Sequence, residues 1–145
     1  MTAASRLVDG GELDALVDVA DVANRDVLAW LAAQRPSCHD GVGEALLRSA
    51  ERCGEWVAYS PSFASYRYVA LVTARRVFAL GLGLRSVGYR LPASLRATAL
   101  KSGAVAADDL GPVWVRFELF RADHPAPDLD FWTLKAYSSA REDRS

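Results

Sequence analysis

The sequence predicts an α+β domain. We expect one antiparallel or mixed sheet of four to five strands, with two N-terminal helices and two helices of the C-terminal half packed on one face. Apolar residues first recur at spacings of three and four, as in helices, and then alternate between turn residues, as in strands. The turns between strands are short, which favours antiparallel pairing. The 145 residues, 51% hydrophobic and 24% charged, suit a single domain over residues 1–145 with flexible ends at 1–10 and 142–145.

The first third of the chain predicts two helices. Residues Glu12–Ala33 carry apolar side chains at helical spacing, and Asn24 falls inside this apolar stripe. An asparagine is unusual at a buried position, so we interpret Asn24 as an N-cap that divides the segment. Asp40 is the expected cap of the second helix, Val42–Cys53, and Gly54 suits the position just past its end.

The pattern changes period after residue 55, where strands are predicted. These are Trp56–Ser60, Tyr66–Thr73, Arg76–Leu80, Arg85–Leu91 and Val113–Phe120. Ala74-Arg75 is the expected turn of a hairpin. Two more helices complete the prediction, Pro92–Lys101 and Asp128 to about Arg141.

Cysteine usage and hydropathy favour a cytoplasmic protein. Cys38 and Cys53 form at most one bridge, and we expect both to be reduced. The N-terminus has no signal-peptide pattern, and no stretch of about 18 apolar residues occurs. We therefore expect no membrane segment.

Charge is distributed unevenly along the chain. Residues 1–55 hold ten acids and five arginines, residues 56–107 hold seven bases and no acid, and residues 108–145 hold eight acids and five bases. One interpretation is that the acidic flanks neutralise the basic middle within the molecule. The other is that the basic segment faces an anionic partner and steers its approach.

The basic segment supplies the predicted binding residues. Its arginines are interleaved with aromatic side chains, and arginine with tyrosine dominates many interfaces and stacks on nucleic-acid bases. The alternative is a sheet whose aromatics form the core and whose arginines are solvated. The predicted binding residues are Arg67, Arg75, Arg76, Arg85, Arg90 and Tyr89.

Catalytic and metal-binding patterns are weak. The run Ser37-Cys38-His39-Asp40 holds a thiol, an imidazole and a carboxylate, but neighbours in sequence rarely point at one another as a triad does. Zinc ligation by Cys38, His39, Cys53 and His124 lacks the short paired spacings of structural sites. Gly81-Leu82-Gly83 lacks the third glycine and the helix of a dinucleotide loop. We predict no catalytic residue, no metal and no cofactor.

From residue 76 to about 140, the order of landmarks resembles the MmcQ/YjbR-like proteins, small bacterial domains. The residues that carry the resemblance are Val77-Phe78-Ala79-Leu80, Tyr89-Arg90-Leu91-Pro92, Gly103-Ala104, Gly111 with Trp114-Val115, and Trp132 with Ala136-Tyr137. The two N-terminal helices depart from that family's pattern. The resemblance implies a compact α+β domain with a non-enzymatic role such as DNA binding, and it supplies no catalytic residue.

The order of elements also resembles that of small acetyltransferases. Those enzymes bind the pyrophosphate of acetyl-coenzyme A with a glycine-rich loop before a helix, whereas the corresponding turn here is Arg90-Leu91-Pro92-Ala93. We therefore predict a non-catalytic binding or regulatory module that docks an acidic macromolecular surface. A protein partner, in an inhibitor or immunity-type role, is preferred; nucleic acid and an acyltransferase-like activity are the alternatives. The sequence does not set the oligomeric state.

Overall fold

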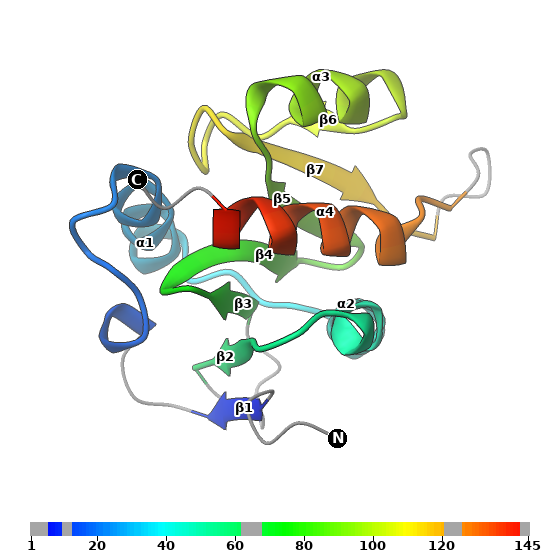
Figure 1. Ribbon diagram of the computed structural model, residues 1–145. Coiled ribbons are helices and arrows are strands. Elements are labelled where there is room, and N and C mark those ends of the chain that lie inside the picture. The colour runs from blue at the N-terminus through cyan, green and yellow to red at the C-terminus, as the bar shows by residue number, and fades with distance from the viewer. Residues whose placement is uncertain (1–5, 10–12, 62–67, 121–125, 143–145) are drawn as a thin grey trace.

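The computed structural model describes residues 6–9, 13–61, 68–120 and 126–142, and it confirms an α+β fold built on one sheet (Figure 1). The strands lie in the order β1-β2-β3-β4-β5-β7-β6. Strand β1 pairs with β2 in parallel, and every other pairing is antiparallel. The strands are β1 Arg6–Asp9, β2 Val57–Ser60, β3 Val69–Thr73, β4 Arg76–Leu82, β5 Ser86–Arg90, β6 Val105–Ala106 and β7 Trp114–Glu118. The helices are α1 Val22–Gln34, α2 Asp40–Ser49, α3 Ala93–Lys101 and α4 Leu129–Glu142, with 3₁₀ turns η1 Leu13–Ala15 and η2 Ala50–Arg52.

The sheet is larger than predicted, because the described residues form seven strands instead of four to five. The two unpredicted strands are its edges, β1 and β6 (Figure 1). Strand β6 has only two residues, and β1 lies in the segment 1–10 that we expected to be flexible. Strand β6 is too short to give a recognisable alternation, and in β1 the two apolar residues are adjacent and do not alternate with polar ones.

Helices cover both faces of the sheet, so the prediction of one covered face is wrong. Strand β3 shows this directly, because Val69 and Leu71 pack in the cluster with α2 and α4, whereas Ala70 and Val72 pack in the cluster with α1. Every residue of β3 is buried. A strand buried on both sides reads as a continuous apolar run and does not reveal which helix lies on which face.

The N-terminal helix is shorter than the predicted Glu12–Ala33. The segment divides as expected, but Asp21 is the N-cap of α1 and Asn24 lies in its first turn. Asn24 is fully buried. Its side-chain Nδ2 donates to the carbonyl oxygens of Asp18 (2.9 Å) and Arg75 (3.0 Å), and its Oδ1 accepts from the Val77 N–H (3.0 Å). A polar side chain therefore occupies the apolar stripe because it connects α1 to the β3–β4 hairpin.

The second helix is capped by a different residue from the one predicted. His39 is the N-cap of α2, with its Nδ1 accepting from the Gly41 N–H at 3.0 Å, and Asp40 is the first helical residue. The negative charge of Asp40 then lies at the positive end of the helix dipole. The backbone continues from α2 into η2, which ends before Gly54.

The predicted hairpin turn at Ala74-Arg75 is confirmed, and its backbone is unusual. Thr73 pairs with Arg76 across the turn, and Ala74 and Arg75 have φ angles of 50° and 60°. Two positive φ angles are typical of the type I′ turn, which normally carries asparagine or glycine because other residues are disfavoured there. The Arg75 carbonyl accepts hydrogen bonds from the Asp18 N–H (2.8 Å) and from Asn24. Contacts with the start of α1 therefore hold the turn in place.

Replacing Ala74 by glycine is expected to stabilise the fold by about 1 kcal/mol, because glycine adopts a positive φ without the steric penalty of a Cβ atom. The free energy of unfolding in urea measures this. Ala29→Gly is a matched control, since Ala29 is also exposed but lies inside α1, where glycine costs about 1 kcal/mol. Equal destabilisation by both substitutions would show that the turn is not strained.

None of the helices in the described ranges is both long and apolar enough to cross a membrane.

Candidate functional site

The structure places two of the predicted binding arginines in an internal cluster. The Asp21 carboxylate lies 3.3 Å from Nε of Arg76 and 3.3 Å from Nη2 of Arg90. All three side chains are only 13 to 16% exposed. Nη1 of Arg76 also donates to the Ala140 carbonyl at 2.7 Å. This cluster joins α1, the sheet and the end of α4, so its guanidinium groups are directed into the molecule.

The ion pairs change the acidity of Asp21. Burial alone would raise its pKa, but the hydrogen bond from the Asn24 N–H and the guanidinium groups of Arg90 and Arg76 together hold the pKa below the usual 3.8. Asp21 is therefore ionised throughout the neutral range and neutralises part of the basic segment.

A third base of the acid-free segment is also paired within the chain. Arg96 lies 3.3 Å from Asp108, whose side chain remains 80% exposed. Outside that segment, Arg116 makes a bidentate pair with Asp109 at 2.8 and 2.7 Å. These pairs match the interpretation in which the acidic flanks neutralise the basic middle.

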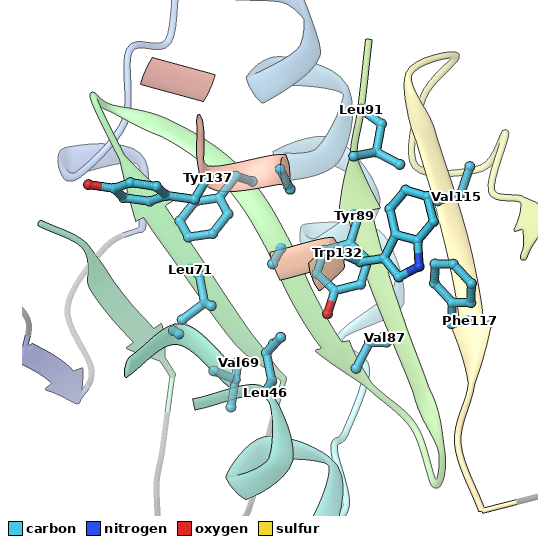
Figure 2. Packing of buried hydrophobic residues seen from close by; sticks show 14 of the residues in the cluster. Leu46, Val69, Leu71, Val87, Tyr89, Leu91, Val115, Phe117, Trp132 and Tyr137 are labelled. Carbon is cyan, nitrogen blue, oxygen red and sulfur yellow. The ribbon is translucent and has the colours of Figure 1, made fainter. Parts of the chain in front are cut away.

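Tyr89 lies in the core rather than on a surface. It is fully buried among core side chains (Figure 2). Its hydroxyl oxygen is 2.7 Å from Oγ1 of Thr133. Thr133 Oγ1 is also 2.7 Å from Oγ of Ser49, which donates to the Leu46 carbonyl. Burial raises the pKa of Tyr89, so the phenol stays protonated. This hydroxyl chain connects β5, α4 and α2, and Tyr89 cannot contact a partner.

The two exposed arginines of the predicted set lie at opposite ends of β4. Arg75 is in the β3–β4 turn, where Nη2 donates to the Val17 carbonyl at 2.9 Å. Arg85 is exposed between β4 and β5, and no carboxylate of the described residues pairs with it. The seven residues of β4 separate these ends by about 23 Å. Arg67 lies outside the described residues. The structure therefore does not bring the predicted set together as one basic face.

The candidate nucleophile is also placed in the core. Cys38 is 4% exposed, and its thiol donates to the His39 carbonyl at 3.4 Å. Burial raises the pKa of this thiol to about 11. Because His39 Nδ1 caps α2, its lone pair is not available as a base for the thiol. The Cys38-His39-Asp40 run thus forms the start of α2, with His39 as the N-cap and Asp40 as the first helical residue.

The other candidate ligands do not form a metal site either. Burial, with the charge of Asp130, raises the pKa of the Cys53 thiol to about 11. Both cysteines are free thiols. Within the described ranges, no group of three or more histidine, cysteine, aspartate or glutamate side chains is placed to hold a metal ion. His124 lies outside them.

Two exposed apolar residues lie where β7 ends beside the β4–β5 connection. Leu84 and Phe120 are the most exposed large apolar side chains that the structure describes, at 76% and 63%. Ser86 pairs with Glu118, and the Leu119 N–H donates to the Arg85 carbonyl at 2.6 Å. This hydrogen bond places the end of β7, which continues to Phe120, beside the turn that carries Leu84. We name Leu84, Arg85 and Phe120 the sheet-end site.

The backbone of Phe120 is strained. Its φ angle is 61°, a left-handed conformation that costs a bulky side chain about 1 kcal/mol or more. The tip of its ring, Cζ, lies 3.8 Å from the place that a Cβ on Gly41 would occupy, so the ring leans toward the start of α2. An exposed phenylalanine held in a disfavoured conformation does little for the core, and such strain is often retained for function.

Sequence reasoning found Arg85 but missed its two apolar neighbours. The available signal was local: Leu84 is a large aliphatic residue in a turn that follows Gly83, and Phe120 is the last residue of an alternating strand. Neither observation alone predicts a site, because only the pairing of β5 with β7 makes the two segments adjoin.

No protein-family model, no curated protein and no solved structure matches this chain. The resemblance to MmcQ/YjbR-like domains therefore stays a prediction.

Proposed function

We propose that this protein is a non-catalytic binding module whose sheet-end site docks another protein. The observation that supports this is the exposure of Leu84 and Phe120, at 76% and 63%, on adjoining segments that also carry the exposed Arg85. Phenylalanine and arginine are both enriched at protein interfaces relative to the rest of the surface. Water covers this apolar surface in the free protein, and a partner that excludes the water gains free energy.

The partner we propose presents an apolar recess with a carboxylate at its edge. Arg85 forms the bidentate, charge-assisted contact to that carboxylate and fixes the orientation, while Leu84 and Phe120 supply buried area. The proposed partner is still an acidic protein surface, as the sequence predicted, but only one of the predicted arginines, Arg85, contacts it. The mechanism is occlusion, in which the bound module covers a functional surface of its partner, as an inhibitor does.

Nucleic acid is a weaker fit to the same geometry. Nonspecific affinity for DNA or RNA comes from several basic residues that neutralise phosphates together. Arg76, Arg90 and Arg96 are paired with carboxylates of the chain itself. Of the three residues of the sheet-end site, Arg85 alone is basic, which is too few for such binding.

Charge reversal at the two ends of β4 tests the proposal. The wild-type protein and the Arg85→Glu and Arg75→Glu variants are immobilised separately, and the proteins that each retains from the native host are quantified by mass spectrometry. We expect at least one protein to be depleted about tenfold or more by Arg85→Glu and retained by Arg75→Glu. If every retained protein responds equally to both variants, the sheet-end site is not the contact surface.

Two substitutions of exposed apolar residues by serine test whether Leu84 contacts the partner. Leu84→Ser is expected to release the same protein, whereas Val22→Ser, at a residue 59% exposed beside the N-cap of α1, is not. Binding that survives moderate salt identifies a protein contact, because a phosphate contact weakens steeply with salt. If Leu84→Ser and Val22→Ser weaken the binding of that protein equally, the sheet-end site is not the contact surface.

Phe120→Asn separates stability from binding. Asparagine tolerates a positive φ better than phenylalanine, so the free energy of unfolding in urea is expected to stay the same or to rise by up to about 1 kcal/mol. Partner capture is expected to fall with that of Leu84→Ser. A strongly destabilised Phe120→Asn variant would show instead that Phe120 has a core role.

A further inference from the structure

We infer that His39 is a further recognition residue of the sheet-end site, and that its imidazole donates a hydrogen bond from Nε2 to an oxygen acceptor of the partner protein. The inference rests on the proposed function, because it extends the same surface toward the start of α2. His39 is exposed and directly precedes that helix. Two features of the residue support this role: where its backbone is held, and which ring nitrogen is used within the chain.

The backbone of His39 is tied to the turn that carries Leu84. The His39 N–H donates to the Gly83 carbonyl at 2.8 Å, and the Gly83 N–H donates to the Ser37 carbonyl at 2.6 Å. Cys38 and Gly83 form a parallel β-bridge between these two hydrogen bonds. The bridge therefore holds His39 next to the residue that precedes Leu84.

The side chain of His39 approaches the same residue as the ring of Phe120. A Cβ atom placed on Gly41 would lie 3.3 Å from His39 Nδ1 and 3.8 Å from Phe120 Cζ. Both rings thus approach the first turn of α2 at Gly41. Through its backbone and its side chain, His39 adjoins both segments of the sheet-end site, the β4–β5 connection and the end of β7.

A hydrogen bond within the chain determines which ring nitrogen of His39 carries the proton. Nδ1 accepts from the Gly41 N–H at 3.0 Å. A backbone N–H can only donate, so Nδ1 carries no proton and the neutral imidazole has its proton on Nε2. Nε2 is not buried, and no group of the described residues is hydrogen-bonded to it. The neutral ring therefore presents one unused donor and no unused acceptor.

This donor determines which partner groups fit at His39. The Nε2–H matches a carboxylate or carbonyl oxygen, whereas a lysine or arginine of the partner would meet a second donor there. An oxygen acceptor agrees with the acidic protein surface proposed for the partner. Because the hydrogen bond to Gly41 already orients the imidazole, binding orders one side chain fewer and costs less entropy.

Asparagine and glutamine at position 39 separate the roles of the two ring nitrogens. His39→Asn keeps an acceptor near Nδ1 in a preferred N-cap residue, but its side chain ends before Nε2. We expect an unchanged or higher urea midpoint and partner binding about fivefold weaker, as for the loss of one hydrogen bond. His39→Gln is long enough to place an amide donor near Nε2, but glutamine is not a preferred N-cap. We expect a lower urea midpoint and partner binding within about twofold of wild type.

The probe is the purified host protein that Arg85→Glu releases and Arg75→Glu retains. Its dissociation constant with each variant is measured by isothermal titration calorimetry, with Leu84→Ser in the same series. If Leu84→Ser weakens binding and His39→Asn does not, His39 is not a recognition residue although the sheet-end site stands. If neither weakens binding, the proposed function fails as well. Equal weakening by His39→Asn and His39→Gln would overturn the contact through Nε2.

The position of the ring proton is tested on the free protein. Long-range ¹H–¹⁵N spectra of the imidazoles, recorded at a mildly alkaline pH where histidine is neutral, distinguish protonated from unprotonated ring nitrogens. The chain has two histidines, His39 and His124, so the signals missing from His39→Asn are those of His39. We expect the proton on Nε2. A proton on Nδ1 would remove the donor and overturn the inference whatever the partner.

Discussion

Replacement of Asn24 by leucine is expected to destabilise the fold by about 4 kcal/mol. The substitution keeps an apolar side chain of similar size in the stripe of α1, but it removes all three hydrogen bonds of the buried amide. The N–H of Val77 then loses its partner, at about 1–3 kcal/mol, and the carbonyls of Asp18 and Arg75 each lose one of two hydrogen bonds, at about 1 kcal/mol each. Urea unfolding at neutral pH measures the loss.

Asn24→Asp is the control that keeps the shape. One carboxylate oxygen still accepts from Val77, but the other lies against two carbonyl oxygens. The folded protein would then favour the protonated carboxyl, so the variant's pKa is raised above its unfolded value of about 3.9. The variant is therefore expected to approach wild-type stability near pH 4 and to lose stability as the pH rises. Leucine and aspartate variants as stable as wild type would show that Asn24 is not the connection.

Replacement of Asp21 by alanine is expected to cost about 3 kcal/mol. It removes the N-cap of α1 and leaves Arg76 and Arg90 without their shared carboxylate. Removing one partner of a mostly buried ion pair is strongly destabilising because the remaining charge stays desolvated. Asp108→Asn is the matched control, since its pair with Arg96 is exposed and is worth less than about 1 kcal/mol.

The Asp21 cluster also predicts acid sensitivity. Because the pKa of Asp21 is lowered in the folded state, its contribution is fully present above the unfolded pKa of about 3.9 and is lost as the pH falls through the lower folded value. The urea midpoint of the wild type should therefore fall more between pH 5 and pH 2 than that of Asp21→Asn. An identical decline in both proteins would assign the acid sensitivity to other carboxylates.

The elements that sequence reasoning predicted well carry their signal locally. Helix α3 follows a proline, β7 alternates apolar and polar residues, and the β3–β4 hairpin has apolar runs on both sides of its turn. The edge strands were missed because β6 has only two residues and the apolar residues of β1 are adjacent instead of alternating. The face on which α1 packs depends on contacts across the sheet, which a doubly buried strand such as β3 does not reveal.

The candidate site was predicted only in part for a related reason. The arginines were visible as a group, but the carboxylate that neutralises Arg76 and Arg90 lies on α1, 55 and 69 residues earlier in the chain. Tyr89 was chosen for its chemistry, whereas its position in the middle of β5 buries it. The segments that carry Leu84 and Phe120 adjoin only through the pairing of β5 and β7.

The left-handed Ala74-Arg75 turn has a consequence for how the chain reaches its native state. A hairpin whose turn residues disfavour the required backbone has little tendency to close early and alone. Hydrogen bonds from Asn24 and Asp18 to the Arg75 carbonyl stabilise this disfavoured turn. The hairpin and the start of α1 should therefore assemble together, late in folding. Unfolding should then be a single cooperative transition, with the amide protons of α1 and the hairpin exchanging with solvent in the same opening event.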